Sequence, residues 1–165
     1  SLVGRSRHVA YMSVWIVAFA VMSAVGGVGD THPGQWLPFW LRACAANRGF
    51  SCVYIENVLD SYCVQASGWA CNQVGVYLAQ KEQAPDEAEV YFTRGCALGT
   101  AAACRNAGQA RNAASLQTEN PVERDYPIIL RGAKGPVDHL DRATLRTMAC
   151  RQGWPGACAP TAPSN

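Results

Sequence analysis

The side chains with the most reactive chemistry in this sequence are its eight cysteines. A cysteine thiol can close a disulfide, hold a metal ion or act as a redox nucleophile. The eight fall into four pairs, and the two members of every pair stand eight positions apart: Cys44 with Cys52, Cys63 with Cys71, Cys96 with Cys104, and Cys150 with Cys158. One spacing found four times favours one shared role for all of them.

The spacing within a pair constrains the backbone between the two cysteines. Eight positions on an unbroken helix correspond to a rise of about 12 Å, whereas a disulfide needs α-carbons within about 7 Å. Pairing therefore requires one helix to end and another to begin in between. Each interval encloses a glycine, and Gly99 can take the left-handed backbone of a helix end. Eight cysteines allow about 105 connectivities, but the repeated spacing favours adjacent pairing, as a staple across a helix hairpin.

The segments that carry the cysteines have the pattern of helices. Apolar positions recur before the first cysteine of a pair, as at Tyr91 and Phe92. The pattern predicts helices over residues 50–65, 69–81, 86–98, 101–114 and 138–151, the last capped by Asp138. Cys63 and Cys96 are offset by 33 residues, as are Cys71 and Cys104, and a period in this range is typical of a helical solenoid.

Two shorter spacings predict local packing. Cys52 and Cys63 are eleven residues apart, about three helical turns, so we expect one helix to carry both. Gly75 and Gly108 each follow a second cysteine by four residues, which predicts a close approach of two helices at both glycines.

At this point the sequence resembles a known family. The patterns Ala-x-x-Tyr-Phe-x-x-x-Cys, ending at Cys96, and Cys-x-x-hydrophobic-Gly, ending at Gly75, resemble the cysteine-rich branch of the Sel-1-like repeats, relatives of the tetratricopeptide repeat. The resemblance covers roughly residues 36–158 and is closest over 63–108. It implies an all-α solenoid in which these cysteines join the second helix of one repeat to the first helix of the next. The sequence departs from the pattern at Tyr77, where the expected tyrosine is displaced.

Residues 9–29 form an apolar run without a charged side chain. As a helix the run spans about 30 Å, the thickness of a bilayer core, and predicts a single transmembrane helix. A signal peptide is the alternative, although the run is long for one. Arg5 and Arg7 precede it, so the positive-inside rule places the N-terminus in the cytoplasm, the matrix or the stroma. The rest of the chain, after residue 29, carries the disulfide framework and therefore needs an oxidising compartment. We expect the bacterial periplasm, with the intermembrane space and the thylakoid lumen as alternatives.

The sequence therefore divides into two parts. Residues 1–29 form an N-terminal tail and transmembrane anchor, and residues 30–165 form an all-α, disulfide-stapled repeat domain. Trp36, Phe39 and Trp40 come shortly after the anchor. They are candidates for a membrane-interface anchor at the headgroup level, and equally for the apolar face of the first solenoid helix.

Residues 115–137 interrupt the repeat. From Cys104 to Cys150 the chain runs 46 positions, against 25 from Cys71 to Cys96. A loop longer than about 15 residues in a compact domain is usually functional or disordered. Within it, an apolar strip with a charged rim makes partner-binding candidates of Tyr126, Ile128, Ile129 and Leu130. The alternative is that Ile128 to Leu130 fold back on the protein's own helices.

Motifs for catalysis are missing from the sequence. No two of the three histidines have metal-ligand spacing, and neither closely spaced Cys-x-x-Cys pairs nor the haem attachment pattern occurs. Some cysteine-rich Sel-1-like proteins have been discussed as β-lactamase-like, but no serine here has the lysine three residues on that this chemistry needs. We therefore expect no catalytic residue, no cofactor and no metal. A net charge of +2 without a basic stripe argues against a nucleic-acid partner.

These observations predict a function in assembly. We expect a non-catalytic, membrane-anchored interaction subunit that binds other protein subunits of a membrane complex, of which an energy-converting assembly is one candidate. The bilayer holds it through residues 9–29. The alternative is a redox-active or hydrolytic, β-lactamase-like repeat enzyme. A reactive cysteine outside the paired set would favour it, and the even count leaves none.

Overall fold

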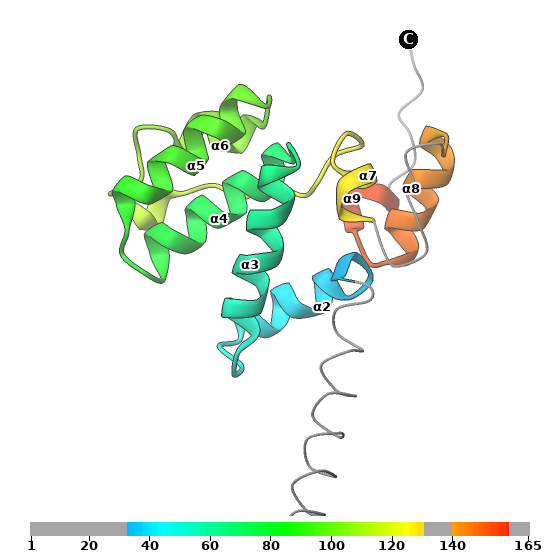
Figure 1. Cartoon of the computed structure of the whole chain (residues 1–165), viewed down its shortest axis with the longest axis horizontal. Helices are drawn as coiled ribbons and strands as arrows, with labels where there is room; N and C mark the ends of the chain where they lie inside the picture. The colour runs from blue at the N-terminus through cyan, green and yellow to red at the C-terminus, as the bar shows by residue number, and fades with distance from the viewer. Residues whose placement is uncertain (1–32, 131–139, 159–165) are drawn as a thin grey trace, which may run out of the picture.

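The structure is a computed structural model that describes residues 33–130 and 140–158 (Figure 1). Over these two ranges the chain is helical and contains no strand. The elements are α2 (Pro33–Ala45), α3 (Ser51–Val64), α4 (Gly68–Gln80), α5 (Pro85–Ala97), α6 (Ala101–Asn106), the 3-10 helix η1 (Ala113–Ser115), α7 (Tyr126–Ile129), α8 (Arg142–Arg151) and α9 (Pro155–Cys158). The fold class is therefore all-α, as predicted.

The predicted membrane anchor, residues 9–29, and the predicted cap Asp138 lie outside the described residues. Among the helices of residues 33–130 and 140–158, none has both the length and the apolar content of a membrane span. Asp141 caps α8, because its carboxylate accepts a hydrogen bond from the backbone N–H of Thr144 at 2.9 Å.

The predicted disulfide pairing is confirmed for all eight cysteines. The α-carbons of the bonded pairs lie between 4.4 and 4.8 Å apart, and every pair has a sequence separation of eight. The bonds join α2 to α3, α3 to α4, α5 to α6, and α8 to α9. Cys52 and Cys63 both lie on α3, as their spacing predicted, so this one helix is stapled at both ends.

The turn between two stapled helices needs a left-handed residue, and glycine provides it three times. Gly49, Gly99 and Gly153 have φ values of 56°, 87° and 94°. In the α3–α4 turn the left-handed residue is Ala66, with φ 75°. Gly68 of that turn has another role: it starts α4, and a Cβ there would lie 3.1 Å from the carbonyl oxygen of Gly95 on α5.

Small residues let α4 and α5 pack closely at the centre of the molecule. A Cβ on Gly75 would lie 2.6 Å from Cε1 of Phe92, whose side chain is fully buried. The predicted close approach is therefore present at Gly75. At Gly108 the prediction is wrong, because a Cβ there would meet no atom within 4 Å. Gly108 instead has φ 79° and turns the chain after α6.

The helix predicted over residues 101–114 is shorter than expected. α6 ends at Asn106, and two turns follow, with Gln109 N–H donating to the Asn106 carbonyl and Asn112 N–H to that of Gln109. The left-handed Gly108 accounts for the early end.

The hydrophobic core extends from α2 to α9. Its largest fully buried apolar side chains are Trp69, Phe92, Leu37, Leu59 and Ile129. Trp69 on α4 meets Trp154, next to α9, with ring centroids 5.3 Å apart in an edge-to-face arrangement. This contact ties the C-terminal helices to the centre of the molecule, although a long connection separates them in sequence (Figure 1).

Candidate interaction surfaces

The segment after η1 is held against α4 and α6 through its backbone. Gln117 is bracketed by two buried asparagines: its carbonyl accepts from Nδ2 of Asn72 at 3.0 Å and from Nδ2 of Asn106 at 2.8 Å. Its N–H donates to Oδ1 of Asn106 at 2.8 Å. Further along, the carbonyl of Glu119 accepts from the indole N–H of Trp69 at 2.8 Å. The described part of the 115–137 insertion is therefore an ordered strap on the helices.

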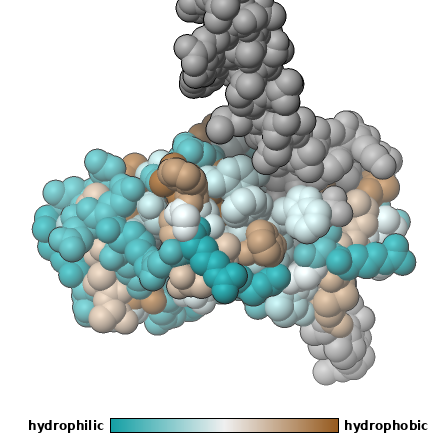
Figure 2. All heavy atoms as spheres, turned by 90° about the horizontal axis from the view of Figure 1, so that it is seen from below, coloured by the Kyte–Doolittle hydropathy of each residue, from teal (hydrophilic) through white to brown (hydrophobic). Residues whose placement is uncertain are grey.

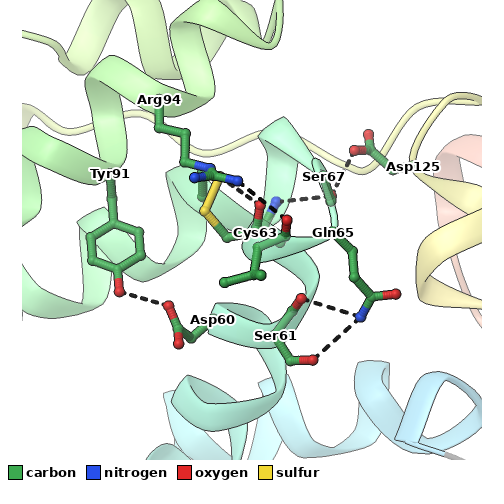
Figure 3. Close-up of a disulfide and its surroundings, with 11 residues drawn as sticks. Asp60, Ser61, Cys63, Gln65, Ser67, Tyr91, Arg94 and Asp125 are labelled. Carbon is green, nitrogen blue, oxygen red and sulfur yellow. Dashed lines mark hydrogen bonds between the residues drawn. A yellow bond between two sulfur atoms is a disulfide. The ribbon is translucent and has the colours of Figure 1, made fainter.

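A buried carboxylate fixes the next part of the strap to the α3–α4 turn. Oδ1 of Asp125 accepts a hydrogen bond from Oγ of Ser67 at 2.7 Å, and Oδ2 accepts one from the N–H of Val122 at 3.0 Å. Ser67 is also the N-cap of α4 and accepts from the N–H of Ala70 (Figure 3). One hydroxyl therefore connects the start of α4 to the strap.

The four partner-binding candidates of the insertion lie within or against the protein's own core. Tyr126, Ile129 and Leu130 are buried in the core, and the half-buried Ile128 packs against the core. They do not form an exposed docking strip in this structure. The arrangement is the alternative one, in which the apolar run folds back on the protein's own helices. The exposed fraction of Ile129 is 0%, which a free docking residue would not have.

The three interface candidates on α2 have different surroundings. Trp36 and Phe39 are half-exposed, while Trp40 is partly buried and packs against the core. The ring of Trp40 lies 5.5 Å from that of Phe39 and 4.9 Å from that of Tyr54 on α3. The side chain that anchors α2 in the core is Leu37, with 0% exposure. Trp36 and Phe39 therefore remain available for contact outside the domain.

The aromatic row continues from α2 onto α3. Phe50, just before α3, is 88% exposed, and Val53 is exposed one turn later. Phe50 and Tyr54 are neighbours on the helix surface because they are four residues apart. We define the outer face as Trp36, Phe39, Trp40, Phe50, Val53 and Tyr54. None of the six is charged. Sequence reasoning missed the α3 half: the i, i+3, i+4 spacing of Phe50, Val53 and Tyr54 marks an apolar stripe, but the spacing does not tell whether the stripe faces the core or the solvent.

A second surface lies where α3 meets α5. The hydroxyl of Tyr91 donates to Oδ1 of Asp60 at 2.6 Å, and Nη2 of Arg94 donates to the Val64 carbonyl at 3.2 Å (Figure 3). The hydrogen bond to Asp60, together with burial, raises the pKa of Tyr91 to about 12. Val64 and Val90 flank this contact and are 67% and 68% exposed. We call Val64, Val90 and Arg94 the α3–α5 face.

An open cleft lies beside the start of α5. It has a volume of about 570 Å³ and is lined by residues of α5 and of the 108–112 turn. Arg111 and Asp86 form an exposed ion pair at 2.6 Å, and Glu89 accepts a hydrogen bond from the N–H of Gly108 at 2.6 Å. These charged groups are therefore already paired within the cleft. Across the described ranges, no cluster of three or more His, Cys, Asp or Glu side chains could hold a metal ion.

Comparison of the chain with models of protein families, with curated proteins and with solved structures found no match. The resemblance to Sel-1-like repeats therefore rests on the residue patterns around Cys71 and Cys96. What the structure defines is an all-helical domain with four disulfide-stapled helix junctions and two exposed surfaces that contain large apolar side chains.

Proposed function

We propose that this chain is a non-catalytic interaction subunit of a larger membrane complex. Residues 9–29 tether it to the bilayer, and the helical domain lies on the oxidising side. The length and apolar character of that run support the tether. The four disulfides support an oxidising compartment, because reducing compartments keep thiols free. The Sel-1-like resemblance supports the interaction role, since helical repeats offer extended binding surfaces.

The observation that carries the interaction role is the α3–α5 face. Val64 and Val90 are exposed, and the hydrogen bond between Tyr91 and Asp60 joins the two helices that carry them. Apolar side chains next to a polar rim, here provided by Arg94, are the usual pattern of a protein interface. A protein subunit that covers both valines is the partner we propose.

The tether is tested on the full chain in its native membrane. We expect the protein to stay in the membrane fraction after alkaline carbonate extraction, and added protease to reach the helical domain only from the oxidising side. Replacing Val17 and Ala20 by arginine should release the chain, because charges in the middle of a span are costly. Release of the unchanged chain would contradict the tether.

The interaction role is tested by purification in mild detergent. Val64→Asp combined with Val90→Asp should lose the protein partners that co-purify with the unchanged chain, while the domain stays folded by circular dichroism. Val122→Asp is the matched control, because Val122 is also exposed but lies on the strap. Retention of every partner by the double variant would remove the α3–α5 face as the docking surface.

A further inference from the structure

The outer face of α2 and α3 has the composition of a surface that meets lipid headgroups. Five of its six side chains are tryptophan, phenylalanine or tyrosine, and the rings of Phe39, Trp40 and Tyr54 form one contiguous row. Aromatic side chains are enriched at the membrane–water interface, where an amphipathic ring fits between water and hydrocarbon. In Figure 2, which views the molecule from below, brown and pale residues lie near the middle of the described surface, with teal residues both between them and at its margin.

The chain length before α2 limits how far this face can lie from the membrane. The apolar run ends at Gly29, and α2 begins at Pro33. Four residues span at most about 14 Å even when fully extended. The headgroup layer on each side of a bilayer is about 5 to 8 Å thick. If the run spans the bilayer, the first turn of α2, with Trp36, starts inside that layer or directly beside it.

Basic side chains gather at the end of the outer face near the α2–α3 turn. Arg42 is in the last turn of α2, Arg48 is in the turn itself, and both are exposed. Lys81, at the end of α4, reaches the same turn, where its ammonium group lies 3.1 Å from Oδ1 of Asn47. Cationic side chains near an anionic membrane are attracted to its surface. The acidic Asp60 is directed away from the face, toward Tyr91 on α5.

We propose that the outer face lies in the headgroup layer of a membrane that contains anionic phospholipid, with α2 along the bilayer surface and the α2–α3 turn on phosphate groups. The inference rests on the proposed tether. It adds a second attachment that fixes the orientation of the helical domain. It also makes the α3–α5 face point away from the lipid, because Arg94 contacts Val64 at the far end of α3 from Phe50.

The experiment places a benzophenone amino acid at Phe39 or Phe50 of the full chain in vesicles of phosphatidylcholine and phosphatidylglycerol. Both positions are exposed aromatic ones, so the probe changes little. Ala97 is the control, since it is exposed at the end of α5, one turn after Arg94, and Arg94 contacts Val64 about 20 Å along α3 from the turn. After illumination we expect several-fold more lipid adduct at 39 and 50 than at 97. Equal yields at all three positions, or crosslinks only to a second copy of the chain, would overturn the inference.

Carbonate extraction of the same vesicles separates the two proposals. If the chain stays in the membrane but 39 and 50 give no lipid adduct, only the headgroup inference fails. If the chain is released, the tether fails, and the inference fails with it.

A charge-reversal pair tests the phosphate contact. Arg42→Glu with Arg48→Glu should lower the lipid-adduct yield at position 50 several-fold when phosphatidylglycerol is present, and little in phosphatidylcholine alone. Arg142→Glu is the control. Arg142 is an exposed arginine at the start of α8, whereas Gly153, which lies near Pro38 of α2, follows the other end of that helix. An unchanged yield in the anionic vesicles would contradict the role of Arg42 and Arg48.

Discussion

At the scale of single residues, Ala66 is the clearest departure from what its position favours. Its φ of 75° is left-handed, and this backbone costs a non-glycine residue about 1 to 2 kcal/mol. Its side chain is exposed, so no packing is lost when it is removed. We expect Ala66→Gly to raise the free energy of unfolding by about 0.5 to 1 kcal/mol, after the added flexibility of the unfolded chain is counted. Urea denaturation measures this.

Gly153→Ala tests the opposite substitution, from glycine to alanine, at another left-handed residue. Gly153 has φ 94°, and an added Cβ would meet no atom closer than 3.8 Å, so any effect comes from the backbone. It should destabilise the domain by about 1 kcal/mol. If both substitutions left the free energy of unfolding unchanged, the left-handed assignments in these two turns would be wrong.

The contact between Tyr91 and Asp60 predicts a response to alkaline pH. In the folded protein, the pKa of the Tyr91 phenol is raised from 10.0 to about 12. The unfolded chain therefore releases the phenol proton first, and the free energy of unfolding falls as pH rises through this interval. At neutral pH, Tyr91→Phe should cost about 1 to 2 kcal/mol because it removes a hydrogen bond to a carboxylate.

The measurement is thermal unfolding at a series of pH values. Between pH about 10 and about 12, the Tyr91→Phe variant should lose stability less steeply than the unchanged protein. Tyr62, Tyr77 and Tyr126 also have raised pKa values, with burial as the first cause, and they provide the same background in both proteins. Parallel curves for the two proteins would show that Tyr91 is not coupled to folding in this way.

At the scale of elements, the packing of α7 on the core determines how much stability a substitution in the insertion costs. Ile129 is fully buried, so Ile129→Ser both removes apolar contacts and buries a hydroxyl, at a cost of about 3 to 5 kcal/mol. Ile128 is half-buried, and Ile128→Ser should cost about 1 kcal/mol. Denaturant titration of the two variants compares them. A docking segment would give the opposite result, with both variants folded and their partner lost.

The stapled hairpins were predictable from sequence because their information is local. The cysteine spacing defines each junction within nine residues, and in three of the four an enclosed glycine makes the turn. The helix boundaries there came out within one or two positions, as for α3 and α4. The path of the strap was not predictable in the same way. Asn72 and Asn106 bind Gln117 across the fold, and no short-range pattern marks such a pair.

The same distinction between local signals and long-range packing applies to the candidate interaction residues. Trp36 and Phe39 were found from their position after the apolar run, which is a local signal. Phe50 and Val53 were missed because a residue's exposure depends on which side of α3 the core occupies. The apolar character of Ile128 to Leu130 was read correctly, but the surface that covers it belongs to the protein itself.

At the scale of the whole molecule, the disulfides supply much of the stability. Each closed loop of this size contributes about 2 to 3 kcal/mol in the loop-entropy description, so four sum to roughly 10 kcal/mol, comparable with the net stability of a domain. We expect strong reductant to melt or greatly loosen the helical domain in a circular dichroism experiment. A melting curve unaffected by reductant would contradict this.

The four bonds should not contribute equally. Cys63 and Cys71 are buried in the core, whereas Cys158 is exposed at the end of α9. Replacing Cys63 and Cys71 together by alanine should therefore lower the melting temperature more than replacing Cys150 and Cys158.

The stapled turns also determine what a protease can release. Arg48 lies between Cys44 and Cys52, so a cut after it leaves both halves covalently joined through that disulfide. The exposed turn between α4 and α5 has no such bond, because two of the disulfides lie wholly before Lys81 and two wholly after it. A single cut after Lys81 leaves no covalent link between the N-terminal part, which would keep the tether, and the part that begins with α5. This turn is therefore a place where limited proteolysis could shed part of the domain without any change in redox conditions, as is the connection between Cys104 and Cys150, which no disulfide crosses either.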